Sequence, residues 1–307
     1  MIIKDCHAHS GGKNYSMDNA GYESNIDSYY ALLKKDNLEI KESIFFGQPY
    51  PYEFLRFYDD HHIPCINYKT INDAVAKECK NYESALFAPI VDERDYNALD
   101  ELNRCRENYE IRAIKVHSDS VNGRPLMLKD NHLIDFAERH ELPIIIHVNN
   151  SFYSEFSRLI SDNANVNFII AHLAFLHKDF MFRQENVYYD TSAITHVNFK
   201  SNVVFNFIKN DVEPCFFNAT KVNYSNISLP SFLKKINGKT EIYKNVELNL
   251  ERIISSAVKR LGSDHMLSGF DYAWSTPLEQ IRIIESSSIS ESDKENIFYK
   301  NFDKLIK

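Results

Sequence analysis

The sequence predicts an α/β protein built as a (β/α)8 barrel, distorted by a long insertion between its seventh and eighth strands. Three observations support this fold class. Short apolar runs recur along the 307 residues, segments with helical spacing separate them, and polar residues stand where several runs end. Alternating strands and helices form parallel sheets, and eight such units are typical of a closed barrel.

The eight predicted strands are these apolar runs. They cover 1–7, 41–46, 85–91, 111–117, 142–148, 166–172, 186–191 and 264–270. Four intervening segments carry apolar residues at the three- and four-residue spacing of a helix, namely 72–82, 96–109, 131–140 and 247–261. Gly262 is expected to end the last of these helices, because glycine favours the position after a helix terminus.

Two connections are longer than the others. Residues 10–30 are polar and contain two adjacent glycines, which predicts a long loop after the first strand. Residues 195–244 contain a polar stretch and the turn signal Asn237-Gly238. Long connections are usually functional or disordered, and in a barrel both would lie over the active-site face. We therefore expect one domain over 1–307, with 195–244 as a candidate lid or insertion.

Charge and composition exclude several classes of partner. A formal net charge of −8 argues against binding to nucleic acid or an anionic membrane surface, because phosphate binding needs a basic patch. The five cysteines form no C-x-x-C pair, so we expect reduced structural thiols rather than a disulfide framework. No leader peptide or membrane-length apolar run is visible, which leads us to expect a cytoplasmic protein.

Polar side chains gather at the predicted strand ends. His7 and His9 are two residues apart and share a strand face, His147 and His172 end the fifth and sixth runs, and Asp271 follows the eighth. In a barrel these positions converge on one rim, where imidazoles and a carboxylate suit zinc or a similar divalent metal. Any one of these histidines alone is more often structural, but their joint placement favours a metal site because isolated buried polar groups are costly.

These residues belong to motifs that resemble a known family. The motifs are DCHAH at 5–9, IKVHS at 114–118, ELPIIIHV at 141–148, NFIIAHLA at 167–174, NVYYDTSA at 186–193, HMLSGFDYAWSTP at 265–277 and IFYKNFDKLI at 297–306. Taken in order, they resemble the amidohydrolase superfamily. The similar branch is amidohydrolase-2, which holds metal-dependent TIM-barrel hydrolases, lactonases and decarboxylases related to aminocarboxymuconate-semialdehyde decarboxylase.

The resemblance implies a ligand set and catalytic residues. It implies that His7, His9, His147 and Asp271 bind the metal, with Asp271 also moving a proton during catalysis. It implies that His172 lies beside the metal-bound water, where it orients or activates that water or polarises the substrate. The expected cofactor is one divalent metal, Zn²⁺ with Mn²⁺ as the alternative.

Three further residues are predicted to contact the substrate. Lys115 and His117 in the fourth strand are expected to hold an anionic group, although in two-metal relatives a carboxylated lysine from this strand bridges the metals. Trp274 either stacks on a substrate ring or packs in the protein. The sequence departs from the branch at Phe270, where serine is common before the aspartate.

The resemblance implies a hydrolase that cleaves an ester, lactone or amide-type bond in a small molecule. A divalent metal lowers the pKa of bound water from about 16 to about 7, which supplies the nucleophile. Decarboxylation on the same site and a non-catalytic metal-binding barrel are the alternatives. We expect a small-molecule substrate, no nucleic acid and no membrane; many relatives dimerise, so a homodimer is left open.

Overall fold

The computed structural model describes most of the barrel and short pieces of the insertion. The described residues are 1–10, 12–13, 23–47, 68–118, 124–148, 152–176, 182–194, 215–216, 227–229, 232–236, 239–243, 246–248, 250–272 and 275–307.

Every predicted strand of the barrel is present. The strands are β1 (Lys4–Ser10), β4 (Glu42–Gly47), β5 (Ala85–Phe87), β6 (Ile90–Val91), β7 (Ile114–Val116), β8 (Ile144–Ile146), β9 (Phe168–Ile170), β10 (Val187–Asp190) and β16 (Met266–Leu267). The third predicted strand is divided into β5 and β6 around Pro89. All these strands pair in parallel, in two sheets with the orders β1-β4-β5 and β16-β10-β9-β8-β7-β6.

The two sheets follow the strand order of a barrel but do not form one continuous closed sheet. Backbone contacts join their edges. The Cys6 N–H donates to the Ser268 carbonyl at 3.0 Å, and a parallel bridge links Ala8 to Tyr272. On the other side, another parallel bridge links Phe87 to Ile111. Both edges are therefore held together, and the fold is a distorted (β/α)8 TIM barrel.

The barrel interior is apolar below its polar rim. One buried cluster takes a residue from every predicted strand, together with the C-terminal segment. Its members are Cys6, Ile44, Phe46, Ala88, Ala113, Ile145, Ile169, Tyr188, Leu267, Phe302, Leu305 and Ile306. Such a layer, filled from all strands, is what a packed barrel requires.

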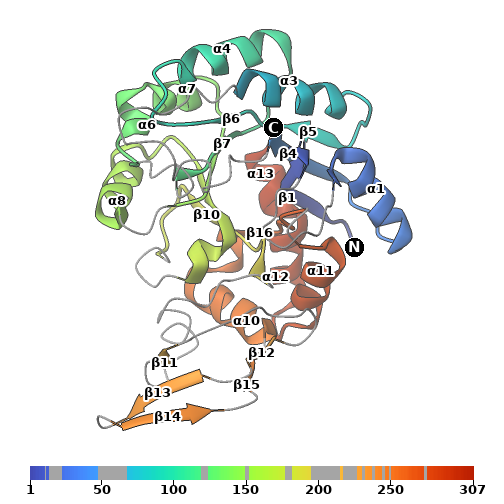
Figure 1. The fold of residues 1–307 in the computed structure, drawn as a ribbon, viewed down its shortest axis with the longest axis vertical. Coiled ribbons are helices and arrows are strands. Elements are labelled where there is room, and N and C mark those ends of the chain that lie inside the picture. Colours follow the sequence, from blue (N-terminus) through green and yellow to red (C-terminus); the bar gives the residue numbers. More distant parts are fainter. Residues whose placement is uncertain are drawn as a thin grey trace.

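Helices surround the strands (Figure 1). They are α1 (Ile26–Lys35), α3 (Tyr68–Cys79), α4 (Ala98–Asn108), α6 (Met127–Asp130), α7 (Leu133–Arg139), α8 (Tyr153–Asp162), α10 (Leu250–Leu261), α11 (Pro277–Ser286), α12 (Glu291–Glu295) and α13 (Asn301–Leu305). The four predicted helices correspond to α3, α4, α7 and α10. Gly262 ends α10 with a φ of 85°, as its conformational freedom predicts. Among the described helices, none is both long and apolar enough to cross a membrane.

Three predicted boundaries are wrong. The loop predicted over 10–30 ends early, because Ile26, Tyr29 and Leu33 form the buried face of α1, a helix that the sequence analysis did not predict. The first strand begins at Lys4, since Met1 and Ile2 are exposed. The eighth strand is only two residues long, because Ser263–His265 forms a 3₁₀ turn before it.

The predicted lid lies mostly outside the described residues. Its described pieces are β11 (Cys215–Phe216), β12 (Ile227–Leu229), β13 (Phe232–Ile236) and β14 (Lys239–Tyr243), and β15 (Val246–Leu248) follows them. They pair as two small antiparallel sheets, β11-β13-β14 and β12-β15. Two even shorter strands, β2 (Gly12–Lys13) and β3 (Glu23–Ser24), pair within the first loop. A role for 195–244 as a lid stays a prediction.

Candidate metal centre

A polar layer lies directly above the apolar layer of the barrel. Lys115, His147 and Asp190 each follow an apolar interior residue by two positions on their strands, and strand side chains alternate with this period. His7 joins them from β1, whose pairing with β4 is irregular between Asp5 and Ala8. The barrel thus places polar groups together at one end of its interior.

His7, His9 and Asp271 bring three ligand atoms together. Asp271 Oδ1 lies 3.4 Å from His7 Nε2 and 3.3 Å from His9 Nε2. The other ring nitrogen of each histidine faces an acceptor: His7 Nδ1 is 2.7 Å from Asp190 Oδ2, and His9 Nδ1 is 3.1 Å from the Gly47 carbonyl. Each Nδ1 therefore carries the proton, and each Nε2 presents a lone pair to the Asp271 carboxylate.

This arrangement fits a divalent cation. Burial lowers the pKa of His9 and lowers that of His7 to about 3, so both rings are neutral near pH 7. Two imidazole lone pairs and a carboxylate repel one another unless a cation lies between them. Metal bonds of about 2.0–2.1 Å in a tetrahedral site place neighbouring ligand atoms roughly 3.3–3.4 Å apart. The distances to Asp271 agree with that spacing.

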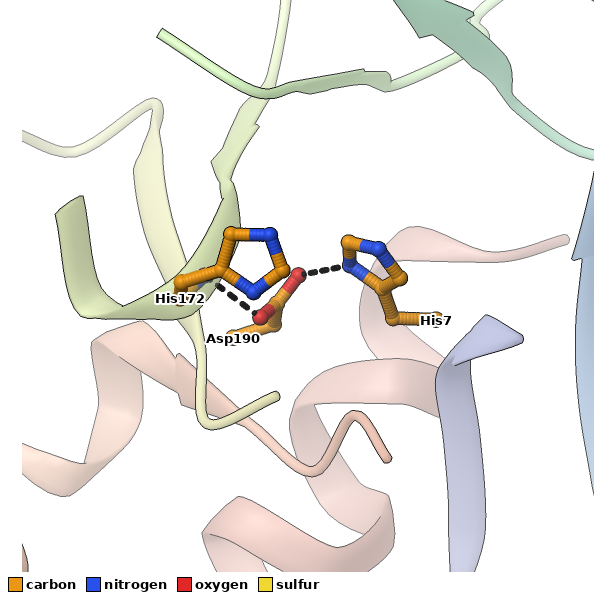
Figure 2. Close-up of side chains that lie close together, drawn as sticks. All are labelled: His7, His172 and Asp190. Carbon is orange, nitrogen blue, oxygen red and sulfur yellow. Dashed lines mark hydrogen bonds and ion pairs between the residues drawn. The ribbon is translucent and has the colours of Figure 1, made fainter. Parts of the chain in front are cut away.

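His7, His172 and Asp190 form a second cluster that could hold an ion. The 2.7 Å distance between His7 and Asp190 is that of a hydrogen bond and is short for two ligands of one ion. Figure 2 shows the Asp190 carboxylate between the two histidines, hydrogen-bonded to the His7 ring and to the His172 backbone. Asp190 is therefore better placed to orient His7 than to bind metal.

The predicted ligand His147 lies in the same histidine cluster but outside the tightest group. Its ring centroid is 3.9 Å from that of His117 and 4.8 Å from that of His172. Among the described residues, neither group of converging ligand atoms includes His147. Three of the four predicted ligands thus come together directly, and His147 adjoins them through His172. Trp274 lies outside the described residues.

Lys115 is a buried cation beside the ligand group. Its Nζ lies 3.4 Å from His7 Nε2 and 4.6 Å from the centroid of the Phe46 ring. Burial lowers the pKa of Lys115 to about 8. His117 is two residues further on, and burial lowers its pKa well below the usual value. Lys115 and His117, the residues predicted to contact the substrate, therefore lie near the candidate metal centre. An anionic substrate group bound there would offset the charge of the lysine.

Asp5 is a supporting residue that the sequence analysis did not single out. It is fully buried and accepts hydrogen bonds from the backbone N–H groups of His7 at 2.9 Å and Phe270 at 3.1 Å. The Tyr29 hydroxyl, on α1, donates to its second oxygen at 2.9 Å. Asp5 thus ties the strand that carries His7 to the segment before Asp271. The available sequence signal was its place two residues before His7 in the first predicted strand.

The backbone at the strand ends is unusual. His172, Leu173 and Ala174 have φ values of 58°, 47° and 53°, and Asp271 has 51°. Residues with side chains adopt this left-handed region at a cost of roughly 1–2 kcal/mol each. Such conformations cluster at functional sites, where the surrounding structure enforces them. The left-handed turn begins at His172, whose backbone N–H donates to Asp190 at 2.9 Å.

Comparisons with known proteins agree with this description. A family model described as amidohydrolase matches residues 5–305. A search of curated protein sequences finds no match to this chain. Among solved structures, 2,6-dihydroxybenzoate decarboxylase from Rhizobium is 14% identical with a TM-score of 0.61, covering 99% of this chain and 98% of that one.

Two other solved structures are similar over nearly their whole length. An amidohydrolase from Burkholderia multivorans is 9% identical with a TM-score of 0.59, covering 99% of each chain. A dihydroxybenzoic acid decarboxylase from Polaromonas, with bound manganese and the inhibitor 2-nitroresorcinol, is 13% identical with a TM-score of 0.56, covering 99% of this chain and 97% of that one. These low identities establish the fold alone. The family model, which spans nearly the whole chain, shows that this protein belongs to the amidohydrolase-2 family of metal-dependent TIM-barrel enzymes.

Proposed function

We propose that this chain is a hydrolase that uses one divalent metal, Zn²⁺ or Mn²⁺, to cleave an ester, lactone or amide-type bond in a small molecule. The convergence of His7 Nε2, His9 Nε2 and Asp271 Oδ1 carries the proposal. These three converging ligands leave positions open for a further ligand and a water, and an open position is typical of catalytic rather than structural zinc sites. The metal, when bound, would lower the pKa of that water and polarise the scissile carbonyl.

The chain's own residues would supply the other functions. Asp271 would accept a proton and pass it to the leaving group, while His172 would contact the attacking water. Lys115 and His117 would hold an anionic substrate group near the metal. His147, from its place in the histidine cluster, is the proposed fourth protein ligand, and the water would then be a fifth ligand, a coordination number that catalytic zinc sites also reach.

Decarboxylation is the second candidate. It is favoured by the buried Lys115 amine, 3.4 Å from His7 Nε2, because a substrate carboxylate would be held beside the ligand group. Two of the similar structures are decarboxylases of dihydroxybenzoic acids. In this reaction the metal and Lys115 would bind the substrate, and no water would attack it.

Isotopic labelling separates the two reactions. The zinc- and manganese-loaded protein would be screened against lactones, esters, amides and carboxylated aromatic compounds. Hydrolysis in water labelled with oxygen-18 places one solvent oxygen in the acid product. Decarboxylation in deuterium oxide releases carbon dioxide and places one deuteron on carbon. We expect oxygen-18 incorporation; deuterium incorporation with carbon dioxide release would replace the hydrolase proposal with the decarboxylase.

The Asp271→Asn variant tests the assigned proton transfer. We expect turnover to fall by a factor of at least about 100, the usual contribution of a positioned acid or base. Metal content measured on the same preparation shows whether the ligand group survives the change. Full activity in this variant would contradict the role of Asp271.

A further inference from the structure

The Ser192 hydroxyl lies between the candidate catalytic histidine and Asp190. Its Oγ is 2.8 Å from His172 Nδ1 and also donates to Asp190 Oδ1. Ser192 and Asp190 are fully buried, and His172 is 4% exposed. The contact is therefore shielded from solvent. In such a buried contact, each hydrogen-bond donor must face an acceptor.

Counting the protons of this network defines its direction. Asp190 Oδ1 accepts hydrogen bonds from the backbone N–H groups of His172 at 2.9 Å and Ser192 at 3.0 Å, and Asp190 Oδ2 lies 2.7 Å from the Nδ1 atom of His7. Both oxygens of this carboxylate therefore act as hydrogen-bond acceptors. The single hydroxyl proton of Ser192 therefore points to Asp190, and Ser192 Oγ can only accept from His172.

A second acceptor faces the same ring nitrogen. The backbone carbonyl of Ser192 lies 3.3 Å from His172 Nδ1, and a carbonyl oxygen cannot donate. Both neighbours of Nδ1 thus require that this atom carry the proton. Neutral imidazole has one N–H, so Nε2 must then be the proton acceptor. Figure 2 shows the second ring nitrogen of His172 on the side of the ring away from Asp190.

We infer that Ser192 is a positioning residue that holds neutral His172 as the Nδ1–H tautomer and so makes Nε2 a proton acceptor. This inference rests on the proposed function, because it selects among the roles considered for His172. A neutral His172 in this tautomer accepts a proton or hydrogen bond from a hydroxyl, as in water activation. It cannot donate a hydrogen bond to a substrate carbonyl or carboxylate.

Nitrogen-15 NMR of histidine side chains tests this inference directly, since the two tautomers differ in the shifts of Nδ1 and Nε2. The full chain would be studied at mildly alkaline pH, both zinc-loaded and metal-free, with the His172 signals assigned from a His172→Gln variant. The wild-type protein should show His172 protonated at Nδ1 in both forms.

Variants of Ser192 test its part in the tautomer. Ser192→Ala should increase the population protonated at Nε2 several-fold, and Ser192→Thr, which keeps the hydroxyl, should restore the wild-type state. Ser268→Ala is the matched control. Ser268 is also buried at the strand ends, but its hydroxyl donates to the backbone carbonyls of Lys4 and Phe298. It should leave the His172 signals unchanged.

Two results would overturn the inference. A wild-type His172 protonated at Nε2 would show that the network runs in the opposite direction. An unchanged tautomer in Ser192→Ala would mean that the backbone carbonyl alone determines it. Because the measurement needs no substrate or turnover, its failure is distinct from failure of the hydrolase proposal, which the oxygen-18 experiment decides.

Discussion

Gly269 shows how closely the centre is packed at the scale of single residues. A Cβ atom at this position would lie 2.9 Å from His7 Cβ and 3.2 Å from the Cβ atoms of Asp190 and Ser192. The backbone must approach closely here, so glycine is required for space. Gly269→Ala should displace His7 and lower metal affinity by a factor of about 10–100, the usual effect of disturbing the surroundings of a ligand.

Metal affinity in the Gly269→Ala variant would be measured by competition with a chelator. Ser268→Ala, one position earlier, is again the control, because its hydroxyl bonds to Lys4 and Phe298 rather than to a ligand. An unaltered affinity in Gly269→Ala would show that His7 does not depend on this close contact.

The buried His7 predicts how the metal-free protein responds to acid. Its folded-state pKa is about 3 against an ordinary value of 6.5, so between these values the unfolded chain binds more protons than the folded one. The free energy of unfolding should therefore decrease as the pH falls through this window. Urea unfolding with chelator at pH 7 and pH 5 measures it. His7→Gln should have a shallower pH dependence; an equal slope would place the acid sensitivity elsewhere.

At the scale of elements, the end of α7 allows an independent test of the left-handed backbone conformation that the structure assigns to Glu141. Glu141 follows this helix with a φ of 54° and is exposed. The Leu142 N–H donates to the Ala137 carbonyl at 2.9 Å, a bond typical of helix ends that favour glycine. Glu141→Gly should raise the free energy of unfolding by about 0.5–1 kcal/mol, because it relieves the left-handed conformation.

The same change inside the helix should have the opposite sign. Glu138→Gly, three positions earlier in α7, should lower the free energy of unfolding by roughly 1 kcal/mol, since glycine is unfavourable in a helix interior. Thermal or urea unfolding of both variants measures the pair. Destabilisation by Glu141→Gly would show that the left-handed residue is not strained.

A helix or a strand could be predicted where the spacing of apolar residues and the length of the segment indicated the same type of element. The apolar runs of the barrel and helices α3, α4, α7 and α10 follow from spacing alone. Helix α1 was missed because its polar flanks resemble a loop, although Ile26, Tyr29 and Leu33 are spaced as one helical face. The brevity of β16 could not be read from the sequence, since its length is decided by pairing with β10.

At the scale of the whole molecule, the barrel explains why distant residues meet. Strand ends of a barrel share one rim, so the order of the motifs predicted that His7, His9 and Asp271 would converge. The positions of Asp5, Asp190 and Ser192 were not predictable to the same degree. Their hydrogen bonds depend on side-chain directions and on the left-handed turn at His172, which no sequence period encodes.

The central claim is that the barrel rim holds one divalent metal between His7, His9 and Asp271. Elemental analysis of the full chain, purified without chelator, tests it most directly. About one zinc or manganese per chain is expected, and the double variant His7→Ala, His9→Ala should lose it while remaining folded by circular dichroism. A wild-type protein that holds no metal even after soaking in zinc or manganese, or a double variant that keeps full occupancy, would contradict the account.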